Sequence, residues 1–236
     1  MSKRLCTICA RGGSKGVANK NTRLLLGLPL VAHSIRQAKE SGMFHYIAVS
    51  SDDPKILEMS SQYGADFVVR RPEELATDRA AKLPVIQHCA LEAEKAAEMV
   101  FDTYTDLDAT SPLRSVEDIR ASIQTFESDD RATNLITGSP ARRSPYFNLA
   151  ELSESGYAVL SKTLSESIVR RQDAPKSYDM NASIYIWNRE SLFSGKSVFQ
   201  ERTLLYEMPE ERSVDIDSEL DFEIVEFLAK KRGELL

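Results

Sequence analysis

The sequence predicts an α/β protein, with a mostly parallel β-sheet that carries helices on both faces. Segments typical of strands alternate with segments typical of helices along the first 140 residues, and this alternation favours parallel strands joined by crossover helices. Polar clusters follow strand-like segments, as in ARGGSKG, SSDD, RRPEE and DATSPLR. Because ligands of such sheets bind beyond the carboxyl ends of the strands, these clusters predict a binding site at that edge.

The predicted elements begin with a short apolar strand at 3–10 and a helix at 29–41 that has Pro29 in its first turn. A strand at 45–53 ends in SSDD, and the next helix runs from Pro54 to Gly64, since proline opens helices and glycine closes them. The later elements of this part are a strand at 65–71, a helix at 82–98, a strand at 100–109, a helix capped by Ser115 and a strand at 134–140.

The regular alternation stops between residues 140 and 181. This stretch is rich in Ser, Pro, Tyr and Arg and has no long helical period, so we expect an insertion that carries a hairpin. Residues 1–139 and 182–236 then form the main domain. In its second part the pattern predicts a strand and a short helix at 182–193, and a strand followed by a terminal helix at 213–233.

The overall charge restricts the classes of function. The formal net charge is −6 and the isoelectric point is about 5.3, which excludes broad non-specific binding of nucleic acid, since that needs a basic face. No apolar stretch reaches the ~18 residues of a membrane span, and the amino terminus lacks the core of a signal peptide. Three cysteines fit a reducing compartment, so we expect a cytoplasmic protein.

Cys6 and Cys9 form a C-x-x-C pair, which raises the question of zinc or redox chemistry. There is no second cysteine pair in the sequence. On a strand, side chains an odd number of residues apart point to opposite faces. We therefore interpret the two as packed core cysteines.

The segment RGGSKG at 11–16 has the parts of an anion cradle. Gly12 and Gly13 let successive backbone N–H groups converge on one point. No Walker A or G-x-G-x-x-G register fits, and the alternative is a solvated glycine turn. The position of Arg11 at a strand end favours an anionic ligand, with a nucleoside triphosphate as the working hypothesis. The other polar groups of this cradle would be Ser14, Lys15, Lys20 and Asn21.

The segment SVDIDSELDF at 213–222 carries a second signal. On a strand, Asp215 and Asp217 point to the same face with Cα atoms ~6.6–6.8 Å apart, and such a pair can share a hard cation such as Mg²⁺. The alternative is helix capping, and we assign that role to Ser218 and Asp221, which have the form of a capping box. Capping does not account for Asp215, so we favour the metal.

Asp108 opens the loop DATSPLR after a predicted strand. It could bind a metal, bind a second substrate or cap the turn, and the residues alone leave these three options open. The three histidines show no spacing typical of a catalytic triad or a metal site.

Five segments in the same order resemble the CMP-sialic acid synthetases, also called acylneuraminate cytidylyltransferases. The resemblance covers nearly the whole chain. It implies a Rossmann-like nucleotidyltransferase fold with a small dimerisation insert at 140–181, and therefore a homodimer. The implied reaction joins CTP to a nine-carbon 2-keto acid sugar, with Mg²⁺, to give a CMP-sugar and pyrophosphate. The segments are ARGGSKGVANKN at 10–21, RPEELATD at 71–78, ATSPLR at 109–114, RRQDAPKSYDMNASIYIW at 170–187 and SVDIDSELDF.

The resemblance also implies residue roles on the nucleotide side. Arg71, Ala76 and Asp78 match the part of the family that holds the cytosine, and Asp215 and Asp217 match its metal aspartates. Among the matching residues, Arg11, Lys15 and Asp215 are implied as catalytic. The residues that match the triphosphate loop are Arg11, Gly12, Gly13, Ser14, Lys15, Lys20 and Asn21.

On the sugar side the resemblance is less complete. Arg171 matches an arginine that reaches the sugar site of the partner subunit, and Tyr178 and Asn181 lie in the same motif. Typical sialic acid enzymes read QPTSPLR, so Asp108 replaces a Gln that faces the substrate, and Phe147 stands where a Lys is often found. We therefore expect CTP as the nucleotide and either N-acetylneuraminate or a related acid such as legionaminate as the sugar.

Three other functions are compatible with parts of the pattern. Another sugar nucleotidyltransferase, such as one for the eight-carbon sugar Kdo, would share the nucleotide loop. A glycosyltransferase could use the D-x-D pair to hold its metal. A nucleotide-binding protein without activity would bind the nucleotide but release no pyrophosphate.

Overall fold

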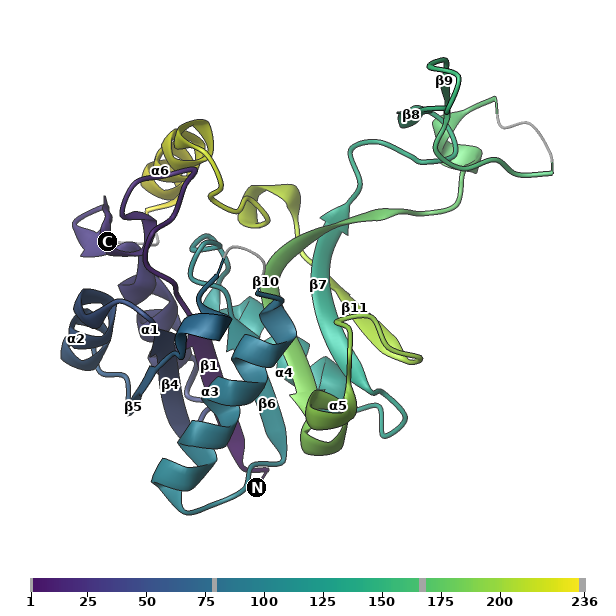
Figure 1. Cartoon of the computed structure of the whole chain (residues 1–236). Coiled ribbons are helices and arrows are strands. Elements are labelled where there is room, and N and C mark those ends of the chain that lie inside the picture. Colours follow the sequence, from purple (N-terminus) through teal and green to yellow (C-terminus); the bar gives the residue numbers. More distant parts are fainter. Residues whose placement is uncertain (1, 78–79, 166–168, 234–236) are drawn as a thin grey trace.

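The computed structural model describes residues 2–77, 80–165 and 169–233, and its centre is one seven-stranded sheet (Figure 1). The strand order is β11-β7-β10-β6-β1-β4-β5. The strands of this sheet are β1 (Arg4–Cys9), β4 (Tyr46–Ser51), β5 (Phe67–Arg70), β6 (Thr103–Leu107), β7 (Asn134–Pro140), β10 (Tyr178–Asn188) and β11 (Thr203–Glu207).

The sheet is mostly parallel, as predicted. β1 pairs in parallel with β4 and β6, β4 pairs in parallel with β5, and β7 pairs in parallel with β11. β10 runs antiparallel to both β6 and β7. The carboxyl ends of β1, β4 and β6 therefore lie at the same edge.

Helices cover both faces of the sheet, which confirms the predicted fold class. Alternate residues of β1 point to opposite sides: Cys6 and Ile8 pack with α1, α2 and α4, whereas Leu5 packs with α3 and α5. Cys9 also packs on the second side, and the cysteines are free thiols. The helices are α1 (Leu30–Ser41), α2 (Pro54–Gln62), α3 (Lys82–Ala97), α4 (Val116–Glu127), α5 (Arg189–Ser194) and α6 (Glu219–Arg232).

Several helix ends follow the predicted capping chemistry. Ser115 and Asp118 form a capping box at α4, and Ser218 and Asp221 form one at α6. In each box the serine hydroxyl accepts from the backbone N–H of the aspartate, which satisfies a donor that has no partner inside the helix. Pro29 precedes α1 as its N-cap rather than lying in the first turn.

The stretch after β7 forms an arm that projects from the sheet (Figure 1). It carries the expected hairpin, made of β8 (Ala150–Leu152) and β9 (Ala158–Leu160). The chain returns to the sheet through β10, whose first residues lie within the stretch 140–181. Among the residues described, no helix combines the length and the apolar character needed to cross a membrane.

Two strand predictions differ from the structure. Residues 213–218, expected to begin with a strand, belong to no strand. The N–H of Ile216 instead donates to the carbonyl oxygen of Thr110 in a loop. The edge strand is instead β11, which we did not predict. A short hairpin of β2 (Leu24–Leu25) and β3 (Leu28–Pro29) also lies before α1.

Candidate active site

The glycine loop begins where β1 ends, and its two glycines are needed for different reasons. Gly13 has a φ of +60°, in the left-handed region that favours glycine. A Cβ on Gly12 would lie 3.0 Å from the Cβ of Asp53, and the Gly12 N–H donates to Asp52 Oδ1 (2.9 Å). The Asn21 side chain donates to the carbonyl oxygen of Arg11 (2.9 Å) and so closes the loop.

The cavity inside this loop is small, with a volume of about 10 Å³. That is room for about one water molecule. This cavity by itself is too small to enclose a triphosphate. The residues around the cavity include Arg11, Gly12, Gly13, Ser14, Lys20 and Asp53.

The structure brings the glycine loop against the acidic segment from the other end of the chain. A Cβ on Gly16 would lie only 1.9 Å from the carbonyl oxygen of Asp217. Lys20 Nζ donates to the carbonyl oxygen of Ile216 (2.5 Å) and lies 3.2 Å from Asp217 Oδ1. Two clusters about 200 positions apart in sequence therefore form one surface.

An apolar cluster beneath α6 explains why these segments meet. Val17 and Ile216 are both fully buried and pack with Leu25, Phe222 and Val225. Burial of each such side chain stabilises the fold by about 1.5–3 kcal/mol. Because Ile216 points inward, its neighbours Asp215 and Asp217 face outward, with Asp215 half-buried and Asp217 exposed.

The electrostatics of Asp215 fit a cation. Burial raises the pKa of Asp215, and the charges of Asp217 and Asp108 raise it further. A divalent cation would offset this repulsion, and Mg²⁺ accepts carboxylate, phosphate and water oxygens. Among the described residues, no set of three His, Cys, Asp or Glu side chains forms a metal site, so the remaining ligands would be phosphate and water.

Asp108 lies just after β6 and is tied down by two partners. Its Oδ1 accepts from the backbone N–H and the hydroxyl of Thr110, each at 2.9 Å. Its Oδ2 lies 2.6 Å from Lys82 Nζ. Burial opposes ionisation of Asp108, but Lys82 and Thr110 lower its pKa to about 2. Of the three roles considered for Asp108, the structure therefore shows the capping of a local turn, together with an ion pair to Lys82.

Lys82 was not among the predicted site residues. It is the first residue of α3, 3.4 Å from Asp106 Oδ2, and its ammonium lies 4.3 Å from the ring centre of Tyr185. Burial alone would lower the pKa of Lys82, but Asp108 and Asp106 raise it. A cation is unfavourable at a helix N-terminus. A lysine at the start of the predicted helix was therefore the sequence signal that could have marked Lys82 as a site residue.

Arg114 ends the ATSPLR motif and holds the loop in place. Its guanidinium is buried and donates to the carbonyl oxygens of Asp108 (2.7 Å) and Ser183 (3.0 Å). It also bonds to the Ser34 hydroxyl. This arginine positions the Asp108 backbone from below the site.

Of the predicted cytosine residues, Arg71 directly follows β5. Arg71 is buried, and its guanidinium donates to the Ser50 hydroxyl (3.3 Å) and carbonyl oxygen (3.0 Å). Ala76 follows a short 3₁₀ turn at Glu73–Leu75. Asp78 lies outside the described residues, and the cytosine role of all three stays a prediction.

Of the other predicted sugar residues, Tyr178 and Asn181 lie in β10, and Arg171 lies in a short 3₁₀ turn at Arg171–Asp173 before it. Asn181 is buried, accepts from the Thr137 hydroxyl (2.7 Å) and donates to the Ser213 hydroxyl (2.9 Å), so it anchors the segment that carries Asp215. Arg171 and Tyr178 instead line a cavity of about 310 Å³ at the base of the arm. There Arg171 donates to the carbonyl oxygen of Ala141 (2.7 Å).

Three sequence relatives resemble the chain over most of its length. The "Post-translational flagellin modification protein B" of Campylobacter coli is 49% identical over 233 residues, covering 99% of this chain and 97% of that protein. The CMP-N,N'-diacetyllegionaminic acid synthase of Campylobacter jejuni is 48% identical over 228 residues, covering 97% and 95%. The N-acylneuraminate cytidylyltransferase of Streptococcus agalactiae is 36% identical over 222 residues, covering 93% of this chain and 52% of that protein.

Solved structures share the fold. CMP:2-keto-3-deoxy-manno-octonic acid synthetase in complex with CTP superposes with a TM-score of 0.69, covering 98% of this chain and 100% of that one at 15% identity. The 4-diphosphocytidyl-2C-methyl-D-erythritol synthase of Anaerococcus prevotii superposes with a TM-score of 0.65 at 12% identity. At such identities the likeness shows the fold alone.

A family model described as cytidylyltransferase matches residues 5–232. This match spans the sheet, the arm and α6, and it agrees with the relatives that align over nearly the whole chain. The resemblance first drawn from five segments is confirmed. The chain belongs to the cytidylyltransferase family of nucleotidyltransferases.

Proposed function

We propose that the protein transfers the cytidylyl group of CTP to a nonulosonic acid and releases pyrophosphate. The observation that carries this proposal is the contact of the basic glycine loop with the acidic segment, through Lys20, Ile216 and Asp217. Basic side chains that could bind a triphosphate and carboxylates that could bind a metal ion therefore lie on the same surface.

A legionaminate-type acid is the sugar that the relatives favour. A relative named for N,N'-diacetyllegionaminic acid is 48% identical, against 36% for one named for N-acylneuraminate. The residues DATSPLR also depart from the spelling typical of sialic acid enzymes at Asp108. In this proposal the Lys82–Asp108 ion pair lies near the sugar, at the place where typical sialic acid enzymes have the neutral amide of a Gln.

The proposed mechanism needs alignment and charge neutralisation rather than a nucleophilic side chain. The anomeric hydroxyl of the sugar attacks the α-phosphorus of CTP, and pyrophosphate leaves. Arg11, Lys15 and backbone N–H groups of the loop stabilise the charge that builds on the phosphates. Mg²⁺ held by Asp215 and Asp217 would, when bound, neutralise phosphate charge and lower the pKa of the attacking hydroxyl.

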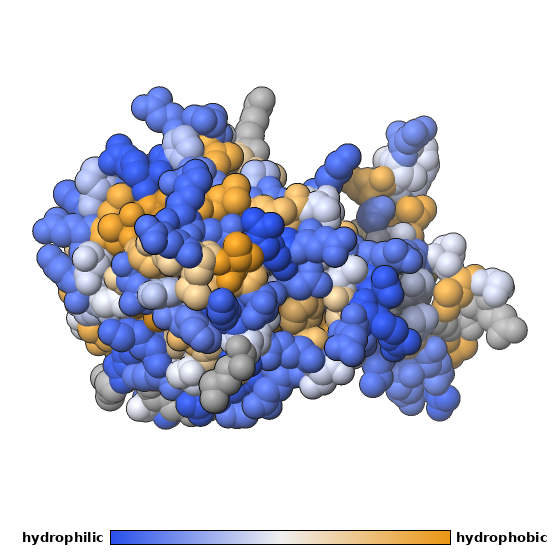
Figure 2. Space-filling model, turned by 90° about the horizontal axis from the view of Figure 1, so that it is seen from below, coloured by the Kyte–Doolittle hydropathy of each residue, from blue (hydrophilic) through white to orange (hydrophobic). Residues whose placement is uncertain are grey.

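We further propose that the arm is a dimerisation element. Leu152, Tyr157 and Val159 on or beside its hairpin are 77%, 74% and 48% exposed, and Figure 2 shows apolar side chains among hydrophilic ones on this part of the surface. Exposed apolar surface of this kind marks an interaction site. A homodimer would cover it and bring the Arg171 of one subunit toward the other.

The test is pyrophosphate release with CTP, UTP, ATP or GTP, with and without Mg²⁺, against legionaminate, N-acetylneuraminate and Kdo. We expect release only with CTP and Mg²⁺, fastest with a legionaminate-type acid. Fastest release with Kdo would favour the eight-carbon sugar instead. Binding of CTP without release with any acid would contradict the proposed reaction.

A further inference from the structure

The segment that carries Asp215 and Asp217 connects β11 to α6 and belongs to no strand. Inside a sheet, hydrogen bonds to the neighbouring strands would fix its backbone. Here the N–H of Ile216 donates to the carbonyl oxygen of Thr110 (2.9 Å), and the Ile216 side chain is buried beneath α6. The position of the two carboxylates therefore also depends on side-chain contacts of the residues before them.

Arg212 ties the start of this segment to α4. It ends the 3₁₀ turn at Glu210–Arg212, three residues before Asp215. Its Nε lies 2.7 Å from Asp118 Oδ2 and its Nη2 lies 2.8 Å from Asp118 Oδ1. This is the two-pronged geometry of the strong guanidinium–carboxylate pairs. The Asp118 side chain is 1% exposed and that of Arg212 is 27% exposed, so water competes little for the carboxylate.

Asp118 is itself held at the beginning of α4. Its Oδ2 also accepts from the backbone N–H and the hydroxyl of Ser115, each at 2.8 Å. One buried carboxylate therefore caps α4 and binds Arg212. Through it the acidic segment is joined to the loop DATSPLR, which leads into this helix.

The residue after Arg212 has a second anchor, on β10. The hydroxyl of Ser213 accepts from the side-chain amide of Asn181 (2.9 Å) and donates to the carbonyl oxygen of Pro209 (2.8 Å). Asn181 is buried. Two consecutive residues are thus bound to α4 and to β10, directly before the aspartates.

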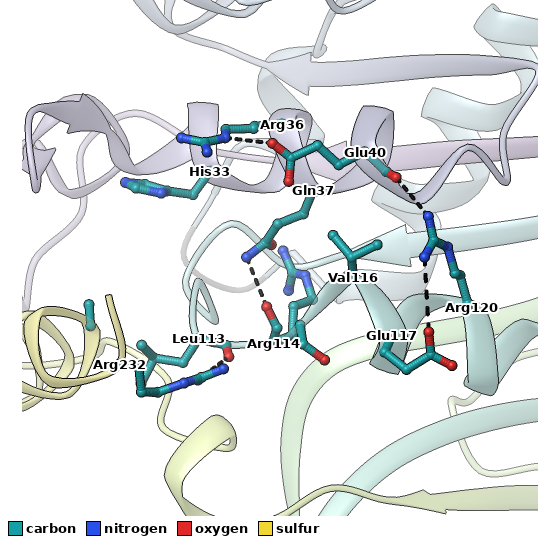
Figure 3. Close-up of a pocket in the computed structure, with 12 residues that line it drawn as sticks. His33, Arg36, Gln37, Glu40, Leu113, Arg114, Val116, Glu117, Arg120 and Arg232 are labelled. Atoms are coloured by element: carbon teal, nitrogen blue, oxygen red, sulfur yellow. Dashed lines mark hydrogen bonds and ion pairs between the residues drawn. The ribbon is translucent and has the colours of Figure 1, made fainter. Parts of the chain in front are cut away.

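The loop before α4 is itself held by α1 and α6. Figure 3 shows a cavity of about 360 Å³ between these elements. Beside it, Gln37 of α1 donates to the carbonyl oxygens of Pro112 (2.7 Å) and Arg114 (2.9 Å). Arg232 of α6 donates to the carbonyl oxygen of Leu113 (2.8 Å). The start of α4 is therefore a fixed support for Arg212. The arginines around the cavity are Arg36, Arg114, Arg120 and Arg232.

We propose that Arg212 is a positioning residue for the carboxylates of Asp215 and Asp217. Through Asp118 it fixes the start of the acidic segment against α4, while Asn181 fixes the next residue against β10. Together these contacts set where a cation held by the aspartates lies relative to the loop DATSPLR. The consequence for catalysis rests on the proposed function, whereas the ion pair itself does not.

Two variants weaken the ion pair without leaving a buried charge alone. Arg212→Lys keeps the charge but loses the two-pronged geometry, because an ammonium is a compact point charge. Arg212→Met combined with Asp118→Asn removes both charges and keeps an amide oxygen that can cap α4. Both are made, so that one remains if the other does not fold.

The first measurement needs neither metal nor substrate. Amide hydrogen exchange followed by NMR reports how often the bond from Ile216 to Thr110 opens. We expect exchange at Ile216 to be about tenfold faster in both variants, since a hydrogen bond to a charged group is lost nearby.

The second measurement is the Mg²⁺ concentration that gives half-maximal pyrophosphate release at saturating CTP and legionaminate. We expect it to rise by about 10–100-fold in both variants, as when residues that orient metal ligands are replaced. The KM for CTP, measured at saturating Mg²⁺, should change less. A purely structural role for Arg212 would leave the Mg²⁺ requirement of the folded enzyme unchanged.

Arg189→Lys is the matched control. Arg189 forms a second two-pronged pair, with Glu94 of α3 (2.9 and 3.0 Å), and the Glu94 side chain is 9% exposed. This change should lower the melting temperature while exchange at Ile216 and the Mg²⁺ requirement stay close to wild type.

Two results would overturn the proposal: exchange at Ile216 in both Arg212 variants no faster than in Arg189→Lys, or an unchanged Mg²⁺ requirement in the active variants. If wild type releases no pyrophosphate with any acid, the proposed function fails instead. Exchange at Ile216 then decides by itself whether Arg212 positions the segment.

Discussion

Asp215 and Asp217 show how much a single residue depends on the one beside it. The two carboxylates face outward because Ile216 between them is buried with Val17 under α6. Burial and the mutual repulsion of the pair raise the pKa of Asp215. Side chains held in this way could bind a cation. Because Ile216 holds the segment in place, replacing the aspartates should change cation binding more than the stability of the fold.

The first prediction concerns these aspartates. Asp215→Ala and Asp217→Ala should each lower pyrophosphate release by about 100-fold or more, as losing an electrostatic transition-state contact does, while circular dichroism and melting temperature stay close to wild type. Asp221→Ala is the control. It removes the N3 half of the capping box of α6, so it should cost about 1 kcal/mol of stability or less and leave turnover largely intact. Normal turnover in both site variants would count against the metal role.

The second prediction concerns the ion pair of Lys82 and Asp108. Lys82→Met removes the cation next to Asp108 and Asp106, and we expect a loss of about 1–3 kcal/mol in urea unfolding at pH 7, the cost of unsatisfied buried groups. Lys95→Met on the same helix is the control, since Lys95 is 71% exposed and its pair should contribute under about 1 kcal/mol.

The same pair gives a pH dependence with a definite sign. The pKa of Asp108 is lowered from 3.8 to about 2, so its ion pair stabilises the fold fully above pH 3.8 and this stabilisation is lost as the pH falls toward 2. Carboxyl-carbon NMR should find Asp108 titrating well below its ordinary range in wild type. In Lys82→Met the titration should move upward, and an unchanged value would exclude Lys82 as the cause.

At the scale of elements, local chemistry placed the helices well and the extended segments less well. Proline, serine and glycine at helix ends were informative because each satisfies or avoids backbone groups near it in sequence. Residues 213–217 alternate between polar and apolar side chains like a strand, yet the backbone N–H of Ile216 donates to the loop at Thr110. Alternation reports which side is buried. It does not report which backbone groups are paired.

The third prediction tests the contact between the glycine loop and this segment. Gly16→Ala would place a Cβ 1.9 Å from the Asp217 carbonyl oxygen, so the two segments must separate, and we expect loss of turnover with a lower melting temperature. Gly13→Ala is the comparison, because its Cβ meets open space and only the φ of +60° is strained. That variant should cost about 1 kcal/mol and keep the contact. Equal kinetics in the two variants would refute the importance of the contact.

At the scale of the molecule, the sheet brings the site together and the arm extends beyond it. The carboxyl ends of β1, β4 and β6 place the glycine loop, Asp52 and Asp108 along one edge. The arm between β7 and β10 leaves this sheet and keeps large apolar side chains on its surface. The proposed homodimer would cover this exposed surface of the arm.

The fourth prediction is that charges on the arm dissociate the proposed homodimer. Leu152→Asp and Tyr157→Asp should shift the protein from dimer to monomer in size-exclusion chromatography with light scattering, because burying an unpaired carboxylate is costly. Phe227→Asp on α6 is the control, since this side chain is 65% exposed and far along the chain from the arm. Dissociation by Phe227→Asp alone would assign the interface to α6 instead.

The sequence by itself determined the alternating strands and helices, the capped helix ends, the inserted hairpin, the two charged clusters and the family. These depend on local backbone chemistry and on residue order, which a single chain displays directly. Only the tertiary structure decided that residues 213–218 lie on a loop, that Lys82 pairs with Asp108, and that Arg114 links this pair to an arginine-lined cavity. Those outcomes depend on which distant side chains are buried together, and burial is a property of the whole fold.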